Sequence, residues 1–249
     1  MGILLEADCW NATRVLLGVA IFFQSLEELQ LERGPQSALL VSESEAGAFF
    51  GFPMPSLRFL CWARFGALAL ILLRPESWPI WALLLGFSWL RSLRFLGSLN
   101  GGSDALTHVS LMGVVMALSL GSPKSGLYWI GVQVILSYFL SGLRKAKGRE
   151  WWNGQALKAF LGQSPVRVSK GVRVLLNNSQ ALWMGSIAVL LFELAFPLAA
   201  LSRSISLIFL ACGGAFHFAV FLCFGLNRFF WVWLAGYPAV YFIASSFSR

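Results

Sequence analysis

The sequence has few charged residues. Of its 249 residues, 12% are Asp, Glu, Lys or Arg, whereas soluble domains contain about 25%. Hydrophobic residues make up 57% of the chain. This composition excludes an ordinary soluble domain and is typical of a chain that lies in a lipid bilayer. We therefore expect an all-α integral membrane protein, with one transmembrane domain over residues 1–249.

Cysteine is also scarce, and its spacing does not suit a metal site. The four cysteines never form a CxxC pair, and they lie within or beside apolar runs: Cys9, Cys61, Cys212 and Cys223. A buried thiol behaves as a small hydrophobic group. We expect neither a metal site nor a disulfide framework.

The basic residues are unevenly placed. Of the 19 Lys and Arg, eight lie between Arg144 and Arg173. Basic residues beside membrane spans usually contact anionic lipid headgroups, and no nucleic-acid-binding motif accompanies them. Membrane lipids are therefore the expected partners, and nucleic acid is not.

Apolar stretches long enough for membrane helices recur along the chain. A helix needs about 20 mostly apolar residues to cross the hydrocarbon core. Residues 1–8 contain acids but no Lys or Arg, so the first stretch is expected to be a permanent span and not a cleaved signal peptide. The sequence predicts a polytopic bundle of about eight spans near residues 10–26, 57–73, 78–96, 105–120, 126–143, 181–201, 205–226 and 229–245.

Two longer connections separate these spans. Residues 27–56 begin acidic and continue with apolar residues, glycine and proline, so we expect a connection that touches the membrane interface. Residues 144–180 contain Trp151, Trp152, Leu157 and Leu161 at helical spacing. This pattern predicts an interfacial amphipathic segment lying in the membrane plane.

Ionisable side chains inside spans are the first candidates for function, because each costs a few kcal/mol or more in lipid. Glu193 lies midway through an apolar stretch, and His217 follows two glycines that allow close approach of another helix or a ligand. Both have a structural alternative. Arg14 and Arg64 lie deep in their spans and could pair with an acid such as Glu193 in a bridge that carries no chemistry.

Lys145 lies at the end of an expected span, next to Arg144. Partial burial and a neighbouring positive charge favour the neutral amine, which is the form that acts as a base. The alternative is an ordinary positive anchor at the membrane boundary. Spacing alone does not decide between the two.

One stretch of sequence carries a resemblance. Residues 137–145 read Ser-Tyr-Phe-Leu-Ser-Gly-Leu-Arg-Lys, and residues 151–157 read Trp-Trp-Asn-Gly-Gln-Ala-Leu. A Tyr-Phe, a small residue with Gly, a basic pair, then Trp and Gly resemble the signature of the vitamin K-dependent gamma-carboxylase-like superfamily, also called the HTTM domain. Asn100 to Asp104, Glu193 before Phe196-Pro197, and Phe216-His217 agree in order.

The resemblance implies roles for individual residues. In the carboxylase, the second residue of the basic pair deprotonates reduced vitamin K, and that residue corresponds to Lys145. The implied cofactor is a reduced naphthoquinone. The remaining implied residues are Glu193, His217, Asp104 and His108 as catalytic partners, and Asn100, Gly101, Gly102, Tyr138 and Phe216 as cofactor contacts.

Two departures limit the resemblance. The carboxylase has a histidine in the segment matching residues 100–104, where this chain has glycine, and His108 is the available substitute. We also expect no large extramembrane domain for binding a propeptide among these residues. Small bacterial members of the superfamily that resemble this chain include membrane components for maturing secreted toxins of the sporulation-delaying type.

Two functions from different classes follow. The first is a carboxylase-like enzyme of the bacterial cytoplasmic (inner) membrane, which uses a quinone and modifies a secreted peptide. The alternative is a noncatalytic bundle that binds or escorts such a peptide together with other export or maturation proteins. A transporter is disfavoured because the sequence shows no clear inverted repeat.

Overall fold

The chain is helical throughout the part that the structure describes. The computed structural model describes residues 2–33, 51, 53–94, 101–162, 176–224 and 227–247, and among them there is no strand. The predicted all-α class is therefore confirmed. In chain order the elements are α1 (Gly2–Arg33), α3 (Leu57–Leu73), α4 (Trp78–Ser92), α5 (Gly102–Ser119), α6 (Pro123–Lys147), α7 (Arg149–Trp152), α8 (Gln155–Gly162), α10 (Ser179–Ala195), the 3-10 helix η2 (Phe196–Ala200), α11 (Arg203–Phe224) and α12 (Asn227–Phe247).

Local chemistry explains several helix ends. The Ser56 hydroxyl accepts a hydrogen bond from the Phe59 N–H at the start of α3, and the Asn178 side chain accepts one from Ala181 at the start of α10. α6 opens on Pro123, which needs no intrahelical donor there. Pro197 lacks an N–H for the α-helical ladder, and the chain tightens from α10 into η2 at that point.

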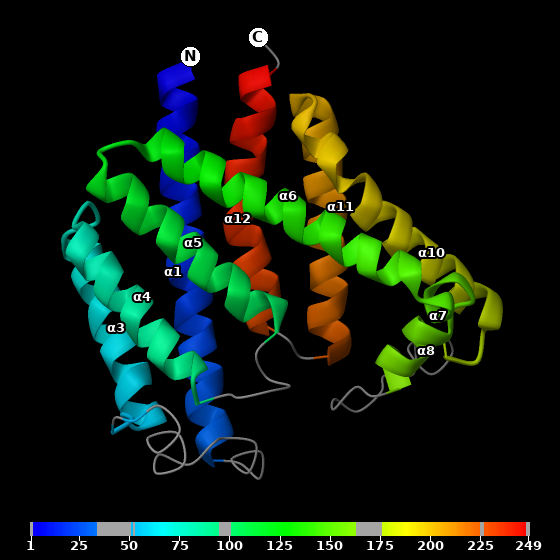
Figure 1. Ribbon diagram of the computed structural model, residues 1–249, viewed down its shortest axis with the longest axis horizontal. Helices are drawn as coiled ribbons and strands as arrows, with labels where there is room; N and C mark the ends of the chain where they lie inside the picture. Colours follow the sequence, from blue (N-terminus) through cyan, green and yellow to red (C-terminus); the bar gives the residue numbers. More distant parts are fainter. Residues whose placement is uncertain are drawn as a thin grey trace.

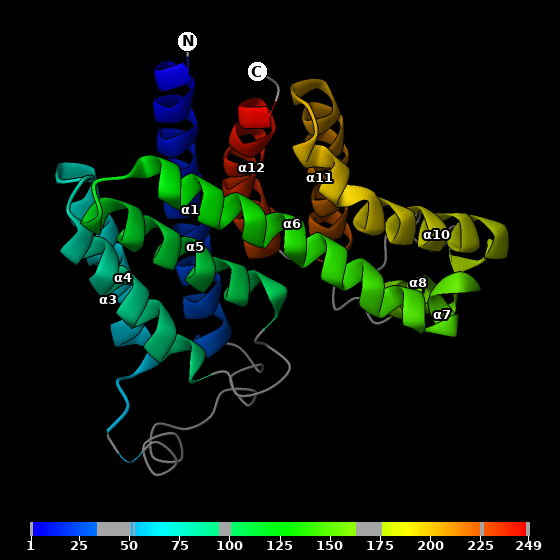
Figure 2. The ribbon, with the colours of Figure 1, turned by 45° about the horizontal axis from the view of Figure 1, so that its top comes forward.

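The helices are arranged around α12. It packs against α1, α5, α6, α11 and η2, and both termini lie at the same end of the bundle (Figure 1). α3, α4 and α5 cover one side of α1. α6 runs obliquely across the front and carries α7 and α8 to the opposite side, where they meet α10 (Figure 2).

Five of the described helices are long and apolar enough to cross a bilayer. They include residues 4–30, 123–147, 179–200, 203–223 and 228–247. The other three expected spans correspond to α3, α4 and α5, with 17, 15 and 18 residues. Five candidate spans are thus found, and the expected count of about eight is not confirmed.

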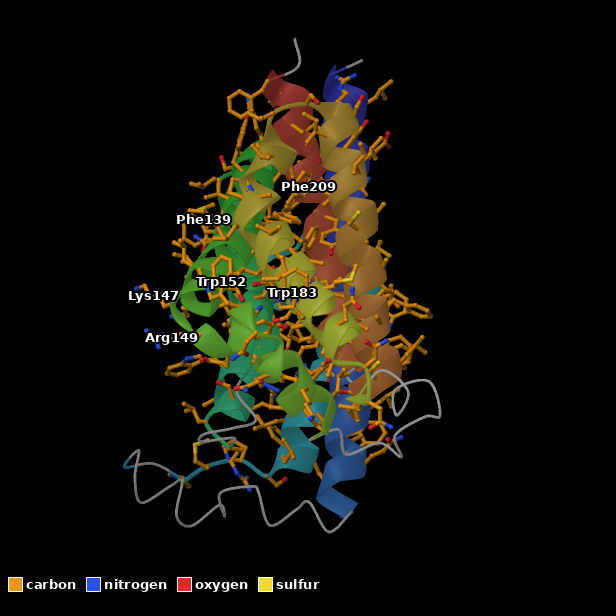
Figure 3. All side chains as sticks on the ribbon, turned by 90° about the vertical axis from the view of Figure 1, so that its right-hand side faces the viewer. Phe139, Lys147, Arg149, Trp152, Trp183 and Phe209 are labelled. Carbon is orange, nitrogen blue, oxygen red and sulfur yellow. The ribbon has the colours of Figure 1, made fainter. Side chains whose placement is uncertain are left out.

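The outer surface is strongly apolar. Leu72 and Leu73 on α3 are 85% and 79% exposed, and Leu207 and Ile208 on α11 are also exposed. Exposed large apolar side chains occur on all the longer described helices. Figure 3 shows side chains extending outward from the helices on one side of the bundle. This surface suits contact with lipid tails, because contiguous apolar patches of this extent are rare on soluble monomers.

The first expected connection begins later than predicted. α1 continues through Glu27 and Glu28 as far as Arg33, so the acidic start of residues 27–56 is helical. Within the second connection, α7 and α8 are helices, and α8 contacts α10. Residues 163–175 of that connection lie outside the described residues.

Candidate functional site

Lys145 lies in the last turn of α6 and is mostly buried. Its Nζ donates a hydrogen bond of 3.0 Å to the hydroxyl of Ser141 one turn earlier. The same nitrogen forms an ion pair with Oε1 of Glu193 on α10. The ring of Trp151 lies beneath the amine, with its centroid 5.0 Å from Nζ. The sequence predicted Lys145 and Glu193 separately, and the structure brings them into direct contact.

A glycine makes this contact possible. A Cβ at Gly142 would lie 2.8 Å from the backbone nitrogen of Leu194 and 3.1 Å from the Cβ of Glu193. Any larger residue would therefore push α6 away from α10. The second glycine of the motif, Gly154, has φ +78°, a left-handed conformation that favours glycine, and it packs against the backbone of Trp183.

Two turns before Lys145, a second group of polar side chains meets in the bundle interior. The hydroxyl of Tyr138 lies 2.6 Å from Nε2 of His217 and 2.8 Å from the hydroxyl of Tyr237. The three residues come from α6, α11 and α12. Tyr138, Ser141 and Lys145 are spaced three and four residues apart, so they share one face of α6.

Aromatic rings enclose this hydrogen-bonded group. Trp233 stacks on His217 with centroids 4.8 Å apart, and Phe196 stacks on Tyr138 at 3.8 Å. Phe216, an expected cofactor contact, lies with its ring centroid 5.0 Å from that of His217. We refer to Tyr138, Ser141, Lys145, Glu193, His217 and Tyr237 as the Lys145 cluster.

Two atoms of the Lys145 cluster are buried without a hydrogen-bond partner among the described residues. They are Oε2 of Glu193 and Nδ1 of His217. Buried polar atoms are usually hydrogen-bonded, so each one left over needs a partner from outside the protein or a functional reason. A carboxylate oxygen and an imidazole nitrogen are both suited to hydroxyl groups of a ligand.

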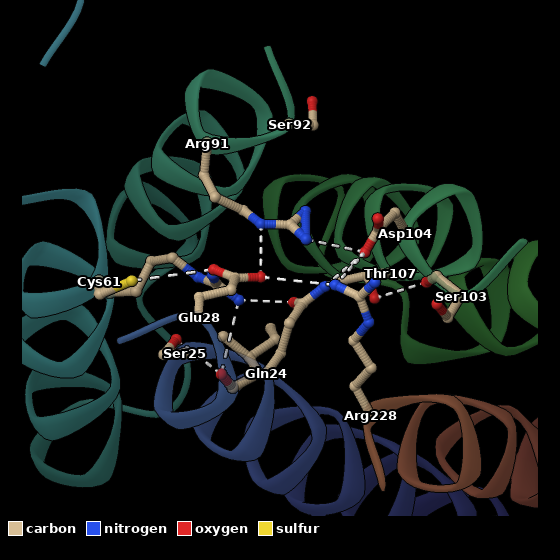
Figure 4. A network of polar contacts seen from close by, with 12 residues as sticks. Gln24, Ser25, Glu28, Cys61, Arg91, Ser92, Ser103, Asp104, Thr107 and Arg228 are labelled. Carbon is tan, nitrogen blue, oxygen red and sulfur yellow. Dashed lines mark hydrogen bonds and ion pairs between the residues drawn. The ribbon is translucent and has the colours of Figure 1, made fainter. Parts of the chain in front are cut away.

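A second polar group lies beside the first turn of α12. The side chain of Glu28 is fully buried and forms ion pairs with Arg64 at 2.9 Å and with Arg91 at 2.6 Å (Figure 4). The Cys61 thiol lies 3.8 Å from Oε2 of the same carboxylate. Sequence reasoning allowed Arg64 and Arg14 to pair with Glu193. That pairing is wrong for Arg64, which binds Glu28, because α3 lies against α1 and not against α10.

Asp104 belongs to this second group. Its Oδ1 accepts a hydrogen bond of 2.7 Å from Gln24 and pairs with Arg91 at 2.9 Å. Arg228 at the start of α12 approaches both Asp104 and Glu28 at 3.8 Å (Figure 4). We refer to Gln24, Glu28, Arg64, Arg91, Asp104 and Arg228 as the arginine cluster. Asp104 therefore contacts arginines and makes no contact with Lys145.

Comparison with known protein families shows to which family the chain belongs. The model of the HTTM domain matches residues 108–244, which is more than half of the sequence. The chain belongs to the HTTM domain family. No curated protein and no solved structure matches it. With five candidate spans and this membrane family, it is an integral membrane protein.

The HTTM match covers the Lys145 cluster completely. Tyr138, Lys145, Glu193, His217 and Tyr237 all lie inside residues 108–244. Of the arginine cluster, only Arg228 does. The Lys145 cluster therefore lies within the family match, and the arginine cluster is formed mainly by residues outside it.

The remaining predicted residues lie apart from Lys145. His108, the first residue of the HTTM match, hydrogen-bonds the backbone of Ser88 on α4. Gly101 and Gly102 mark the start of α5. Asn100 lies outside the described residues.

Sequence reasoning missed several residues of both clusters. Glu28 was assigned to a connection, although it follows Gln24 by four residues and so continues the buried face of α1. Arg228 lies between the expected spans at residues 205–226 and 229–245, a position typical of a connecting turn. A functional role for Tyr237 was not predictable, because nothing in the sequence distinguishes it from the neighbouring aromatic residues.

Proposed function

We propose that this HTTM protein is a membrane-embedded, carboxylase-like enzyme in which Lys145 acts as a base. The observation that carries the proposal is the contact of Lys145 with Ser141 and Glu193, two turns from the hydrogen-bonded Tyr138, His217 and Tyr237. The proposed cofactor is a reduced naphthoquinone, and the proposed substrate is a secreted peptide. The proposed location is the bacterial cytoplasmic (inner) membrane.

The ion pair of Lys145 and Glu193 supports a role as base. Glu193 is 5% exposed and Lys145 19% exposed, so both groups are largely removed from water. The carboxylate of Glu193 lies beside the amine and holds it in the bundle interior. When Lys145 accepts a proton from an acidic hydroxyl beside it, this carboxylate stabilises the ammonium that forms.

Tyr138 is placed to hold a ligand and to pass a proton. Its hydroxyl joins His217 to Tyr237, so a proton gained or lost at one end can be balanced along the chain of hydrogen bonds. The surrounding rings of Phe196 and Trp233 exclude water from these groups. Exclusion of water protects reactive species and strengthens each electrostatic interaction in the site.

Two atoms without a partner among the described residues, Oε2 of Glu193 and Nδ1 of His217, support this choice of cofactor, because each can hydrogen-bond a hydroxyl group of a reduced naphthoquinone. Aromatic side chains beside them suit its planar rings. When bound, such a group would supply a strong base through its oxygenation, since hydroquinone and O₂ yield quinone epoxide and water, and this base would remove a proton from the peptide. Lys145 is the residue expected to accept the hydroxyl proton.

We also propose that α3, α4 and α5 cross the membrane with the five longer helices. At 1.5 Å per residue they are about 23 to 27 Å long, close to the hydrocarbon thickness of about 30 Å. Their turns at residues 74–77 and 120–122 are short, as expected between neighbouring antiparallel spans. Labelling of single cysteines placed in these turns, from either side of sealed vesicles, tests the crossing.

The proposed activity is tested with purified protein in nanodiscs of native lipid. Reduced naphthoquinone and O₂ are supplied, and the epoxide is measured for wild type and Lys145→Ala. We expect loss of about 10²-fold or more in rate, the usual contribution of a general base. The matched control is Lys147→Ala, because Lys147 also lies in the last turn of α6 but extends away from the helices (Figure 3).

The same experiment can also reject the proposed enzymatic activity. Thermal unfolding of each variant is measured first, so that loss of fold is separated from loss of chemistry. A folded wild type without turnover, or a folded Lys145→Ala variant with full turnover, would reject the role of Lys145 as base. The noncatalytic peptide-binding bundle would then be the better assignment, with Lys145 and Glu193 as an ion pair between α6 and α10.

A further inference from the structure

An apolar groove lies between α1 and α3, on the side of the bundle opposite α10. Its volume is about 930 Å³, and it is open along one side. Representative lining residues are Val15, Gly18 and Phe22 from α1, and Phe65, Leu68 and Leu72 from α3. Val15 and Leu72 are 65% and 85% exposed. The groove therefore presents a concave apolar surface to whatever surrounds the helices.

The groove has the direction and length of a lipid tail. It follows α1, one of the five candidate spans, from Arg14 to Leu26. Twelve residues of helix correspond to about 18 Å. One leaflet of the hydrocarbon core is about 15 Å deep. A chain lying in the groove would thus extend through roughly one leaflet, parallel to the helix.

One end of the groove is polar and holds an arginine paired with an exposed carboxylate. Arg14 is 8% exposed, and its guanidinium pairs with Glu76 at 2.8 Å and donates to the backbone oxygen of Pro75 at 3.1 Å. It also donates to the side chain of Asn11 at 2.7 Å. A guanidinium carries five N–H donors, more than these three described acceptors require.

This polar end lies at the level of a helix turn. Pro75 and Glu76 belong to the turn between α3 and α4, where Glu76 is 67% exposed and Trp78 follows at the start of α4. Polar turns and tryptophan mark the membrane surface in helical membrane proteins. Arg14 is therefore held against this turn, and the apolar groove leads away from it along α1 and α3.

We propose that the groove between α1 and α3 binds one acyl chain of an anionic phospholipid, with the lipid phosphate at Arg14. Arginine suits this partner because its planar fork of donors matches phosphate oxygens. The exposed Glu76 can turn toward water when phosphate takes its place beside the guanidinium. The site is separate from the Lys145 cluster, since none of the residues lining the groove belongs to that cluster.

A photoreactive lipid tests the proposal. The protein is placed in nanodiscs with phosphatidylglycerol carrying a diazirine in its acyl chain, and the labelled peptides are mapped. The same experiment is done with phosphatidylcholine of identical chains. We expect the peptides of α1 and α3 to be labelled more strongly than those of α11, whose exposed Leu207 and Ile208 report ordinary lipid contact.

Two variants separate a built site from surface lipid. Gly18→Phe fills the groove, and the structure has room for it because a Cβ at Gly18 meets only Leu68, at 3.8 Å. Labelling of α1 and α3 should then fall to the level of α11. The control is Gly86→Phe on the exposed face of α4, where nothing lies within 4 Å, and it should leave the labelling unchanged.

Arg14→Gln tests the headgroup. One interfacial arginine contributes about 1 kcal/mol toward an anionic lipid, so the preference for phosphatidylglycerol over phosphatidylcholine should fall about fivefold. Thermal unfolding confirms that each variant is folded.

Equal labelling of α1, α3 and α11, or labelling unaffected by Gly18→Phe, overturns the proposal and indicates surface lipid only. Displacement of the label by reduced naphthoquinone also overturns it and assigns the groove to the quinone.

Discussion

Removal of Glu28 should be one of the most damaging single changes in this protein. Its carboxylate is fully buried and pairs with Arg64, also fully buried, and with Arg91, which is 1% exposed. Glu28→Ala removes this carboxylate from both guanidinium groups, while Asp104 still pairs with Arg91 at 2.9 Å. Breaking a buried ion pair by removing one partner costs about 3–5 kcal/mol, because the other charge stays buried.

The measurement is unfolding in a fixed detergent or nanodisc, followed by tryptophan fluorescence. We expect the free energy of unfolding to fall by about 3–5 kcal/mol for Glu28→Ala. The matched control is Glu76→Ala, which also removes a carboxylate from an arginine. Since Glu76 is 67% exposed, its loss should cost at most about 1 kcal/mol. Equal effects of the two substitutions would refute the reasoning that burial makes the arginine cluster a structural centre.

Two further predictions concern the Lys145 cluster. Gly142→Ala places a methyl group 2.8 Å from the Leu194 nitrogen, so α6 and α10 should separate and stability should fall by about 1–3 kcal/mol in thermal unfolding. Gly86→Ala, in open space, should not destabilise the helix. Tyr138→Phe leaves His217 and Tyr237 without their shared partner and should cost about 1–3 kcal/mol. An unchanged midpoint in either variant would contradict the corresponding contact.

Helical periodicity was enough to predict part of the site. Tyr138 and Lys145 are seven residues apart in a continuous apolar run, so any helix there places them on one face. Glu193 was recognisable because a carboxylate surrounded by apolar residues must find a partner. The identity of that partner was not predictable from spacing, because 48 residues separate Lys145 from Glu193 and the packing of α6 on α10 depends on Gly142.

The arginine cluster shows why the rest was missed. Glu27 and Glu28 follow the first apolar stretch directly, and a pair of acids is usually the end of a span. Here the helix continues because Arg64 and Arg91, supplied by α3 and α4, neutralise Glu28. Their positions lie 36 and 63 residues further along the chain, so the compensation belongs to the tertiary structure and not to the local pattern.

α12 links the two clusters physically. Its first turn carries Arg228 into the arginine cluster, and its middle supplies Tyr237 to the Lys145 cluster and Trp233, which stacks on His217. One continuous helix carries all three residues, so a shift of α12 at Arg228 would also move the ring stacked on His217. Packed interiors transmit such shifts because they contain little free volume. The arginine cluster can therefore act as the fixed end that holds Trp233 and Tyr237 in register with α6.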